Sequence, residues 1–350
     1  MTMAAEQKEN IIIRADGNAH IGAGHLMRCL TIADAFKCRD RVCFWCADEA
    51  SAELARQRGY SAVSLGTDYR DMLSEIPALE RLWSCGEEAG PQTILVDSYY
   101  VSAAYLQALQ AFGRVFLLED VPGQSRPVDG VINYNAFADE EAYRAIYGQG
   151  DKARRYIGPS YIPLRPQFAG RDYRVREQVK QLLVTTGGGD GENIAGRILE
   201  RLEDMDCVIH VISGPYNPHG DWLARYAQEH PYVVLHRHVE EMADLMLQCD
   251  LAVTAGGTTV YELCALGVPF VCFSCAENQE ALADYAGRQG IGLDAGQYHY
   301  NAERTLDNIG RLAKQAAVDW QGRRQMSQRA RKLVDGRGAV RLTEALLRRK

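Results

Sequence analysis

The sequence predicts an α/β protein made of two Rossmann-like, doubly wound domains that face each other across a cleft. Short apolar segments alternate with helical patterns along most of the chain, and a proline-containing stretch near the middle interrupts this alternation once. The alternation is typical of parallel β-sheets that helices cover on both faces. The length of 350 residues suits two domains of about 150–180 residues each.

Apolar segments in the first half of the chain have the length and composition of buried strands. They cover residues 10–15, 41–47, 61–65, 93–99, 114–120 and 128–133. Helical patterns lie between most of them, for example over residues 25–36 and 105–112. We therefore expect a Rossmann-like N-terminal domain over residues 1–160.

The stretch 157–177 contains three prolines and no clear periodicity, which predicts a connection between the domains at residues 161–178. Strand patterns resume at residues 180–186, 207–214, 232–239, 250–257 and 269–276. The last 50 residues have a helical pattern and are rich in Arg, Lys, Gln and Ala. A second Rossmann-like domain with a helical tail is therefore expected over residues 179–350.

The composition is ordinary for a globular protein. Apolar residues make up 47% and charged residues 24% of the chain, and the net charge of −7 gives no indication of a nucleic-acid partner. No apolar run approaches the roughly 20 residues that span a membrane, and the first ten residues are too polar for a signal peptide. We expect a cytoplasmic protein without a membrane partner; the pattern does not predict an oligomeric state.

The chain has ten cysteines, and four of them form two pairs with CxxC spacing: Cys43 with Cys46, and Cys272 with Cys275. Both pairs lie in apolar segments that are expected to be strands. Residues three apart on a strand point to opposite faces, so neither pair is well placed to share a metal. The sequence therefore favours reduced thiols packed in the core over a metal site or a disulfide.

The segment "RADGNAHIGAGH" places Gly22, Gly24 and His25 where a strand gives way to a helix. Met27 stands where the dinucleotide-binding fingerprint requires a third glycine, so that fingerprint is absent. The positive end of the helix dipole disfavours a charged imidazole, which predicts a neutral His25 that can accept a proton. His25 is thus a candidate general base; the alternative is a histidine that caps the helix.

Two further glycine turns follow strands in the second half. In "VTTGGGDGEN", backbone N–H groups of Gly187, Gly188 and Gly189 can approach a diphosphate, although no Lys-Ser/Thr follows as in a P-loop. In "TAGGTTVYE", Gly256, Gly257 and Thr258 open a helix, and Glu262 is placed to accept hydrogen bonds from a ribose. The alternatives are plain structural turns and a first-turn glutamate that the helix dipole favours.

Other polar residues give weaker signals. Glu277, Asn278 and Gln279 follow a strand and are expected at the edge where an open α/β sheet binds ligands. His236 and His238 share one face of a strand, but no third ligand has suitable spacing, so no metal site is expected. No nucleophile elbow of the form Gly-x-Ser-x-Gly is present.

Taken in order, these motifs resemble a family of nucleotide-sugar enzymes. The family is the UDP-2,4-diacetamido-2,4,6-trideoxy-β-L-altropyranose hydrolases of pseudaminic (nonulosonic) acid biosynthesis, which have the GT-B fold. The similarity spans residues 11–290 and rests on "RADGNAHIGAGH", "VDSYY", "NYNAFA", "GPSYIPLR", "GGGDGEN" and "ENQE". The chain departs from the family in three places. Ser98 stands where the family often has His, the loop "TAGGTTVYE" has an extra residue, and the helical tail is longer.

The resemblance implies that His25 activates a water molecule, which attacks the anomeric carbon of a UDP-linked sugar and releases UDP without a cofactor. It also implies substrate contacts from the matched motifs, at Arg14, Asp16, Gly22, Gly24, Asp97, Tyr99, Asn135, Tyr161, Arg165, Asn278 and Gln279. Two alternatives stay open. A GT-B glycosyltransferase would use His25 to deprotonate an acceptor hydroxyl, and a non-catalytic protein would only bind the nucleotide sugar.

Overall fold

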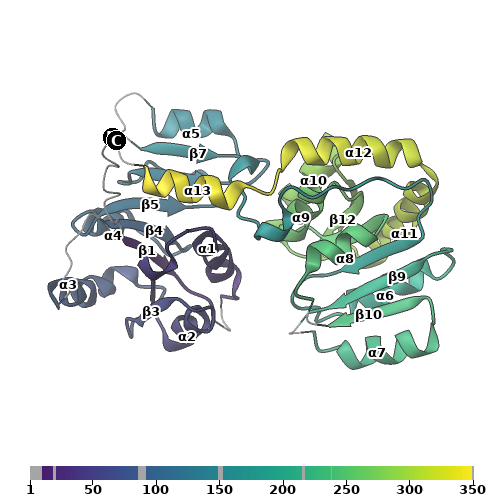
Figure 1. Ribbon diagram of the computed structural model, residues 1–350, viewed down its shortest axis with the longest axis horizontal. Coiled ribbons are helices and arrows are strands. Elements are labelled where there is room, and N and C mark those ends of the chain that lie inside the picture. Colours follow the sequence, from purple (N-terminus) through teal and green to yellow (C-terminus); the bar gives the residue numbers. More distant parts are fainter. Residues whose placement is uncertain are drawn as a thin grey trace, which may run out of the picture. The chain divides into compact units, whose positions relative to one another are not determined.

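The protein consists of two compact units (Figure 1). The computed structural model describes residues 10–18, 21–85, 92–148, 153–214, 217–237 and 239–348. Unit 1 comprises Met1–Arg165 together with Arg337–Lys350, and unit 2 comprises Pro166–Gly336. His238, which the sequence pairs with His236, lies outside the described residues.

Unit 1 is built on a parallel sheet of seven strands in the order β3-β2-β1-β4-β5-β6-β7. The strands are β1 (Asn10–Ala15), β2 (Val42–Cys46), β3 (Ser61–Ser64), β4 (Gln92–Asp97), β5 (Arg114–Leu118), β6 (Gly130–Asn133) and β7 (Arg154–Ile157). The helices are α1 (Gly24–Asp34), α2 (Glu49–Gln57), α3 (Ile76–Cys85), α4 (Ala103–Leu109), α5 (Glu140–Ile146) and α13 (Gly338–Leu347), with 3₁₀ turns η1 (Arg39–Arg41), η2 (Met72–Glu75) and η3 (Pro159–Tyr161). The apolar sequence of β1 accounts for its central, buried place in this sheet.

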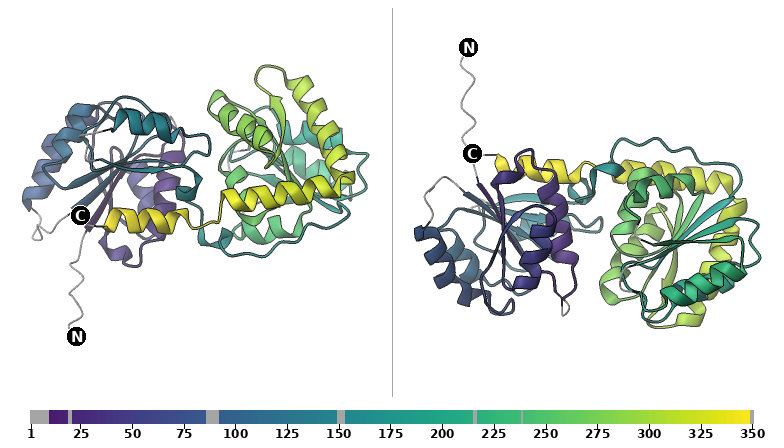
Figure 2. Two further views of the ribbon diagram at one scale, coloured as in Figure 1. Left: turned by 90° about the horizontal axis from the view of Figure 1, so that it is seen from above. Right: turned by 60° about the horizontal axis from the view of Figure 1, so that its bottom comes forward.

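Unit 2 is built on a parallel sheet of six strands in the order β10-β9-β8-β11-β12-β13. The strands are β8 (Gln181–Thr185), β9 (Val208–Ser213), β10 (Val233–Arg237), β11 (Leu251–Ala255), β12 (Phe270–Ser274) and β13 (Leu293–Gln297). The helices are α6 (Ile194–Leu202), α7 (Gly220–Glu229), α8 (Met242–Gln248), α9 (Thr258–Leu266), α10 (Glu277–Gln289), α11 (Ala302–Val318) and α12 (Trp320–Leu333), with the 3₁₀ turn η4 (Pro166–Phe168). Figure 2 shows helices on both faces of each sheet.

The strand order of each sheet reverses direction once along the sequence. In unit 1 the reversal lies between β1 and β4, and in unit 2 it lies between β8 and β11. In open α/β sheets, ligands bind at the carboxyl ends of the strands beside such a reversal. The sequence motifs with His25 and with Gly187–Gly189 follow β1 and β8, so each lies at such a reversal.

The terminal helix α13 belongs to unit 1, whereas the sequence predicts a second domain over residues 179–350 as a whole. Arg114 of β5 donates a hydrogen bond to the carbonyl of Leu346 (2.7 Å), and Arg154 of β7 donates one to the carbonyl of Arg348 (2.9 Å). Leu342 and Leu346 are buried. The helix is thus held by side chains that are distant in sequence and that no local pattern reveals.

The proline-containing connection is also more ordered than a free linker. Tyr173 donates a hydrogen bond to the carbonyl of Cys249 (3.0 Å), and Arg176 forms an ion pair with Asp250 (2.7 Å). Residues from Pro166 onward therefore form part of unit 2. Among the residues described, no helix combines the length and apolar character needed to cross a membrane.

Two edge strands, β7 and β13, do not appear among the strands that the sequence predicts. Their sequences "RRYI" and "LDAGQ" contain few apolar residues because an edge strand buries less surface than a central one. Of the two cysteine pairs expected in the core, Cys46 and Cys272 are buried in their strands, whereas Cys43 and Cys275 are only partly buried.

Candidate functional site

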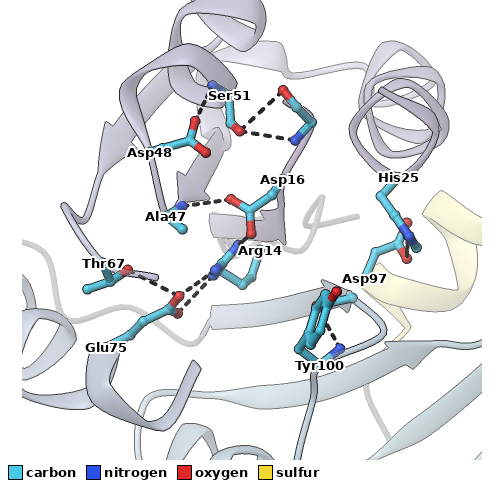
Figure 3. Close-up of polar contacts among 12 residues, drawn as sticks. Arg14, Asp16, His25, Ala47, Asp48, Ser51, Thr67, Glu75, Asp97 and Tyr100 are labelled. Carbon is cyan, nitrogen blue, oxygen red and sulfur yellow. Dashed lines mark hydrogen bonds and ion pairs between the residues drawn. The ribbon is translucent and has the colours of Figure 1, made fainter. Parts of the chain in front are cut away.

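His25 lies beside Asp97 at the reversal of strand order in unit 1 (Figure 3). His25 is in the first turn of α1, directly after the glycine turn, and Asp97 is the last residue of β4. The imidazole Nδ1 is 2.7 Å from Asp97 Oδ1. Both side chains are largely buried, with 8% of His25 and 1% of Asp97 exposed. The histidine-capping alternative is not realised, because the side chain bonds to a carboxylate rather than to backbone.

Arg28, one turn after His25 on α1, anchors the same carboxylate. Its Nε and one terminal nitrogen are each 2.6 Å from an oxygen of Asp97. The other terminal nitrogen donates to Asp120 and to the Tyr134 hydroxyl, each at 2.9 Å. A planar guanidinium that binds a carboxylate in this bidentate way fixes the orientation of that carboxylate. Arg28 therefore sets the position from which Asp97 meets His25.

Tyr99 and Asn135 extend this cluster along the carboxyl edge. The Tyr99 ring stands edge-on to His25 with 4.4 Å between ring centroids, and its hydroxyl donates to Asp120 at 3.2 Å. The Asn135 amide is 3.4 Å from the same Asp120 carboxylate. Tyr99 is 69% exposed, so it forms the solvent-facing side of the cluster.

The electrostatics of the cluster keep Asp97 ionised. Burial alone would raise its pKa, but the Arg28 guanidinium and the contact with His25 lower the pKa of this carboxyl to about 2. An ionised carboxylate only accepts hydrogen bonds, so Nδ1 of His25 carries the proton of this contact, and in the neutral form of the ring the lone pair is on Nε2. Among the described residues no protein group bonds to Nε2. This nitrogen is therefore available to accept a proton from a ligand or from water.

We expect the stability of unit 1 to depend on the ionisation of Asp97. A carboxyl whose pKa falls from 3.8 to about 2 on folding stabilises the fold above pH 4 and loses that contribution, about 2 kcal/mol, as the pH falls from 4 to 2. Asp97→Asn should flatten the pH dependence of the unfolding free energy measured from pH 6 to 2. The exposed Asp221→Asn is the control; an unchanged slope in Asp97→Asn would contradict the shifted pKa.

Arg14 and Asp16, predicted to contact substrate, take part in a buried ion network (Figure 3). The Arg14 guanidinium donates to Asp16 (2.5 Å) and, through two nitrogens, to Glu75. Asp16 also accepts from the Ala47 amide (2.7 Å). Arg14 is fully buried and Asp16 is 2% exposed. These side chains hold the end of β1, and neither presents a polar group to solvent.

The remaining predicted residues of unit 1 lie apart from this network. Gly22 has a positive φ of 73° and Gly24 begins α1, so the two glycines form the turn that places His25 at the start of the helix. Tyr161 packs edge-on against Tyr156 of β7, with 5.5 Å between ring centroids, and Arg165 ends the first segment of unit 1. The described contacts do not bring Tyr161 to His25.

In unit 2 the glycine loop after β8 is exposed at the carboxyl edge. Gly187 has a φ of 94°, and Gly214 packs so closely that a Cβ there would lie 2.5 Å from the Gly188 carbonyl oxygen. The buried Asp190 accepts hydrogen bonds from the amides of Ile194 (2.7 Å) and Ala195 (2.8 Å). The protein's own carboxylate thus occupies the N-terminus of α6, so a phosphate at this loop would have to use the glycine amides.

The N-terminus of α9 differs, because no side chain caps it and its first turn holds no acidic residue. Its N-cap is Gly257, and Thr258 is exposed. Gly256 packs on Gln279, whose side chain accepts from the Cys275 amide (2.9 Å). Asn278 is exposed in the first turn of α10, and Glu262 is half-buried on α9. The predicted nucleotide residues thus follow β8 and β11, and the predicted substrate residues Asn278 and Gln279 follow β12, the next strand in the sheet.

His236 contacts a histidine of the neighbouring strand. Its Nε2 is 2.8 Å from Nδ1 of His210 on β9, and His210 in turn bonds to Gln181 (2.6 Å). Within the part of the chain that the structure describes, no group of three or more His, Cys, Asp or Glu side chains is arranged to hold a metal ion.

Sequence reasoning missed three members of the His25 cluster, namely Arg28, Asp120 and Tyr134. Two of them leave a signal in the sequence. Arg28 is three residues after His25 and so lies on the same face of α1, and Asp120 follows the strand "RVFLL" at the carboxyl edge. The contact of Tyr134 with Arg28 spans 106 residues and has no local signal.

No protein-family model matches the chain. The spore coat polysaccharide biosynthesis protein SpsG of Bacillus subtilis (strain 168) is 27% identical over 344 residues, which cover 95% of this chain and 96% of that protein. A pseudaminic acid cytidylyltransferase and UDP-2,4-diacetamido-2,4,6-trideoxy-beta-L-altropyranose hydrolase of Helicobacter pylori is 30% identical over 124 residues, which cover 35% of this chain and 22% of that protein.

Solved structures show the fold. A UDP-glucosyltransferase from Polygonum tinctorium superimposes with a TM-score of 0.67 at 13% identity, covering 98% of this chain and 99% of that one. Other glycosyltransferases of known structure match over similar lengths. The two parallel-sheet, Rossmann-like units of this chain thus have the fold of GT-B glycosyltransferases, and the predicted fold class is confirmed.

Proposed function

We propose that this protein is an enzyme of sugar biosynthesis that hydrolyses a UDP-linked 2,4-diacetamido-2,4,6-trideoxy sugar to UDP and the free sugar. The observation that carries the proposal is the His25–Asp97 pair, in which the carboxylate holds the ring by Nδ1 and leaves Nε2 open. The names of the relatives support the chemistry of the substrate, since one acts in polysaccharide biosynthesis and another includes a UDP-sugar hydrolase.

The proposed reaction needs one base and a stabilised leaving group. Nε2 of His25 takes a proton from water as the water oxygen attacks the anomeric carbon, and Asp97 stabilises the imidazolium that forms. A positioned base of this kind contributes about 10²–10⁴-fold in rate. UDP departs with the bonding electron pair of the glycosidic C–O bond. Amides at Gly187–Gly189 and at the uncapped N-terminus of α9 are the donors proposed to stabilise its charge.

The proposal is tested by incubating the protein with UDP-2,4-diacetamido-2,4,6-trideoxy sugars without any acceptor and measuring UDP and free sugar. Stoichiometric release of both is the expected result. UDP-glucose serves as the control donor. Release of UDP only after an acceptor is added would overturn the hydrolase proposal.

Glycosyl transfer is the second candidate function, because the solved structures with this fold include glycosyltransferases. In that reaction Nε2 of His25 would deprotonate an acceptor hydroxyl instead of water. The acceptor-free assay separates the two functions, since a transferase turns over slowly or not at all without its acceptor.

We predict that Glu262 contributes to nucleotide binding. A carboxylate on α9, close to the glycine turn after β11, is suited to accept hydrogen bonds from the ribose hydroxyls. Glu262→Ala should weaken UDP binding by about 1–3 kcal/mol, measured by calorimetry. Glu229→Ala, an exposed glutamate at the end of α7, should leave UDP affinity unchanged. Equal affinity in Glu262→Ala would place the nucleotide elsewhere.

We also predict that turnover does not require a divalent metal, because amides and helix dipoles are proposed to stabilise the departing diphosphate. UDP release should proceed at an unchanged rate after dialysis against EDTA. Complete loss of activity that Mg²⁺ or Mn²⁺ restores would contradict this prediction and favour the transferase.

A further inference from the structure

A groove in unit 2 lies between the chain segment Tyr173–Val175 and helix α12, and we call it the α12 groove. It encloses about 400 Å³, which lies within the roughly 300–1,000 Å³ of small-molecule sites. In Figure 1 the segment that leads into β8 runs alongside α12. The groove plays no part in the function proposed above.

Hydrogen bonds fix the two walls of the groove to each other. Trp320 donates from its indole nitrogen to the Val175 carbonyl (3.3 Å), and Arg331 donates to the carbonyls of Arg171 (2.5 Å) and Tyr173 (3.4 Å). These bonds tie both ends of α12 to the segment. The groove therefore has a defined shape, because hydrogen bonds hold its two walls in place.

The groove is on the opposite edge of the sheet from the proposed nucleotide residues. Tyr173 bonds to Cys249, and Arg176 pairs with Asp250, which directly precedes β11. The segment thus lies at the amino ends of the parallel strands, whereas the glycine turns follow their carboxyl ends. Five-residue strands separate the two edges by about 16 Å. A ligand in the groove would therefore occupy a second site.

The groove is positively charged in a chain whose net charge is −7. Helix α12 carries five basic residues and no acidic one. Arg174, Arg324 and Arg331 line the groove together with aromatic and neutral polar side chains, and no carboxylate lines it. The nearby carboxylate of Asp319 is engaged as the N-cap of α12.

Arg174 and Arg324 are groove cations without a counter-charge, and Arg331 bonds to backbone carbonyls alone. On the same segment Arg171 pairs with Asp244 and Arg176 with Asp250. Within the described residues, by contrast, no carboxylate forms an ion pair with Arg174 or Arg324. The Arg324 guanidinium lies over the Trp320 ring, 4.8 Å from its centroid. Stacking of this kind orients the planar guanidinium and leaves its N–H groups free to donate.

We infer that the α12 groove binds a ligand through a phosphate group. The polar side chains available are chiefly donors, namely guanidiniums with the Gln328 amide and the Ser327 hydroxyl, so the ligand must be rich in acceptors. A phosphate or diphosphate carries enough charge to balance several guanidiniums and matches their forked geometry, whereas one carboxylate would leave the groove positive. The phosphate belongs either to a soluble molecule or to a lipid headgroup.

The test compares two double variants that remove the same charge. Arg174→Gln with Arg324→Gln removes two groove cations that form no ion pair with a carboxylate. Arg329→Gln with Lys332→Gln removes two exposed cations of α12 that do not line it. Calorimetry with inorganic pyrophosphate, with UDP at saturation so that the proposed nucleotide site is filled, should show that the groove variant loses at least tenfold in affinity while the control variant stays within twofold of wild type. Thermal unfolding of each variant verifies that the fold is intact.

A second arm identifies the source of the phosphate. Co-sedimentation with phosphatidylglycerol vesicles, against phosphatidylcholine vesicles, should show the same dependence on the groove variant if the phosphate belongs to a lipid. Pyrophosphate binding without vesicle binding assigns it to a soluble ligand. The inference is overturned if neither probe binds, or if both double variants weaken binding equally. None of these readouts requires catalytic activity, so they are independent of the proposed hydrolysis.

Discussion

His25→Ala is expected to lower kcat for UDP release by at least about 10²-fold while UDP affinity stays nearly unchanged. The loss follows because the variant removes the only proposed proton acceptor for water, and a positioned base contributes about 10²–10⁴-fold. Affinity for UDP is preserved because the proposed nucleotide contacts are in unit 2, whereas His25 is in unit 1. Single-turnover UDP release and calorimetry with UDP measure the two quantities separately.

A matched variant for this experiment is His299→Ala. His299 is a histidine of unit 2 that bonds to Glu280 (2.9 Å) and lies outside the His25 cluster. It should keep the wild-type rate of UDP release. If His25→Ala hydrolyses the substrate at the wild-type rate, His25 is not the base. If it loses UDP affinity together with turnover, His25 contacts the phosphates instead.

Arg14→Met is expected to destabilise unit 1 by about 3–5 kcal/mol. The substitution leaves the carboxylates of Asp16 and Glu75 buried without their shared cation, and a buried charge that loses its partner costs about this much. Tyr105 and Thr67 also donate to Glu75, so the network has other members, but none of them is charged. Urea unfolding followed by tryptophan fluorescence measures the change.

The control for Arg14→Met is Arg56→Met, which removes an exposed arginine paired with Glu49 at the surface of α2. Its unfolding midpoint should stay close to that of the wild type. A normal unfolding curve for Arg14→Met combined with loss of substrate binding would show that Arg14 reaches the ligand, as the family resemblance implies. Destabilisation would instead establish the structural role that its burial indicates.

The sequence by itself determined the fold class and the order of the motifs along the chain. Alternating apolar segments and helices predict parallel sheets, because a strand buried on both faces reads as a continuous apolar run. The glycine turn that delivers His25 is also local information, since a positive φ favours glycine and the next residues begin a helix. Such features depend on neighbours within a few residues.

Only the tertiary structure decided how these residues are used. His25 and Asp97 are 72 residues apart, and Arg14 and Glu75 are 61 apart. Strands β1 and β4 are neighbours in the sheet, and this brings Asp97 close to His25. The turn η2 places Glu75 near the end of β1, where its carboxylate binds the buried Arg14. The same applies to α13, which joins unit 1 through side chains of β5 and β7. The role of a charged residue in a motif thus depends on whether the fold places it against a ligand or against another buried side chain.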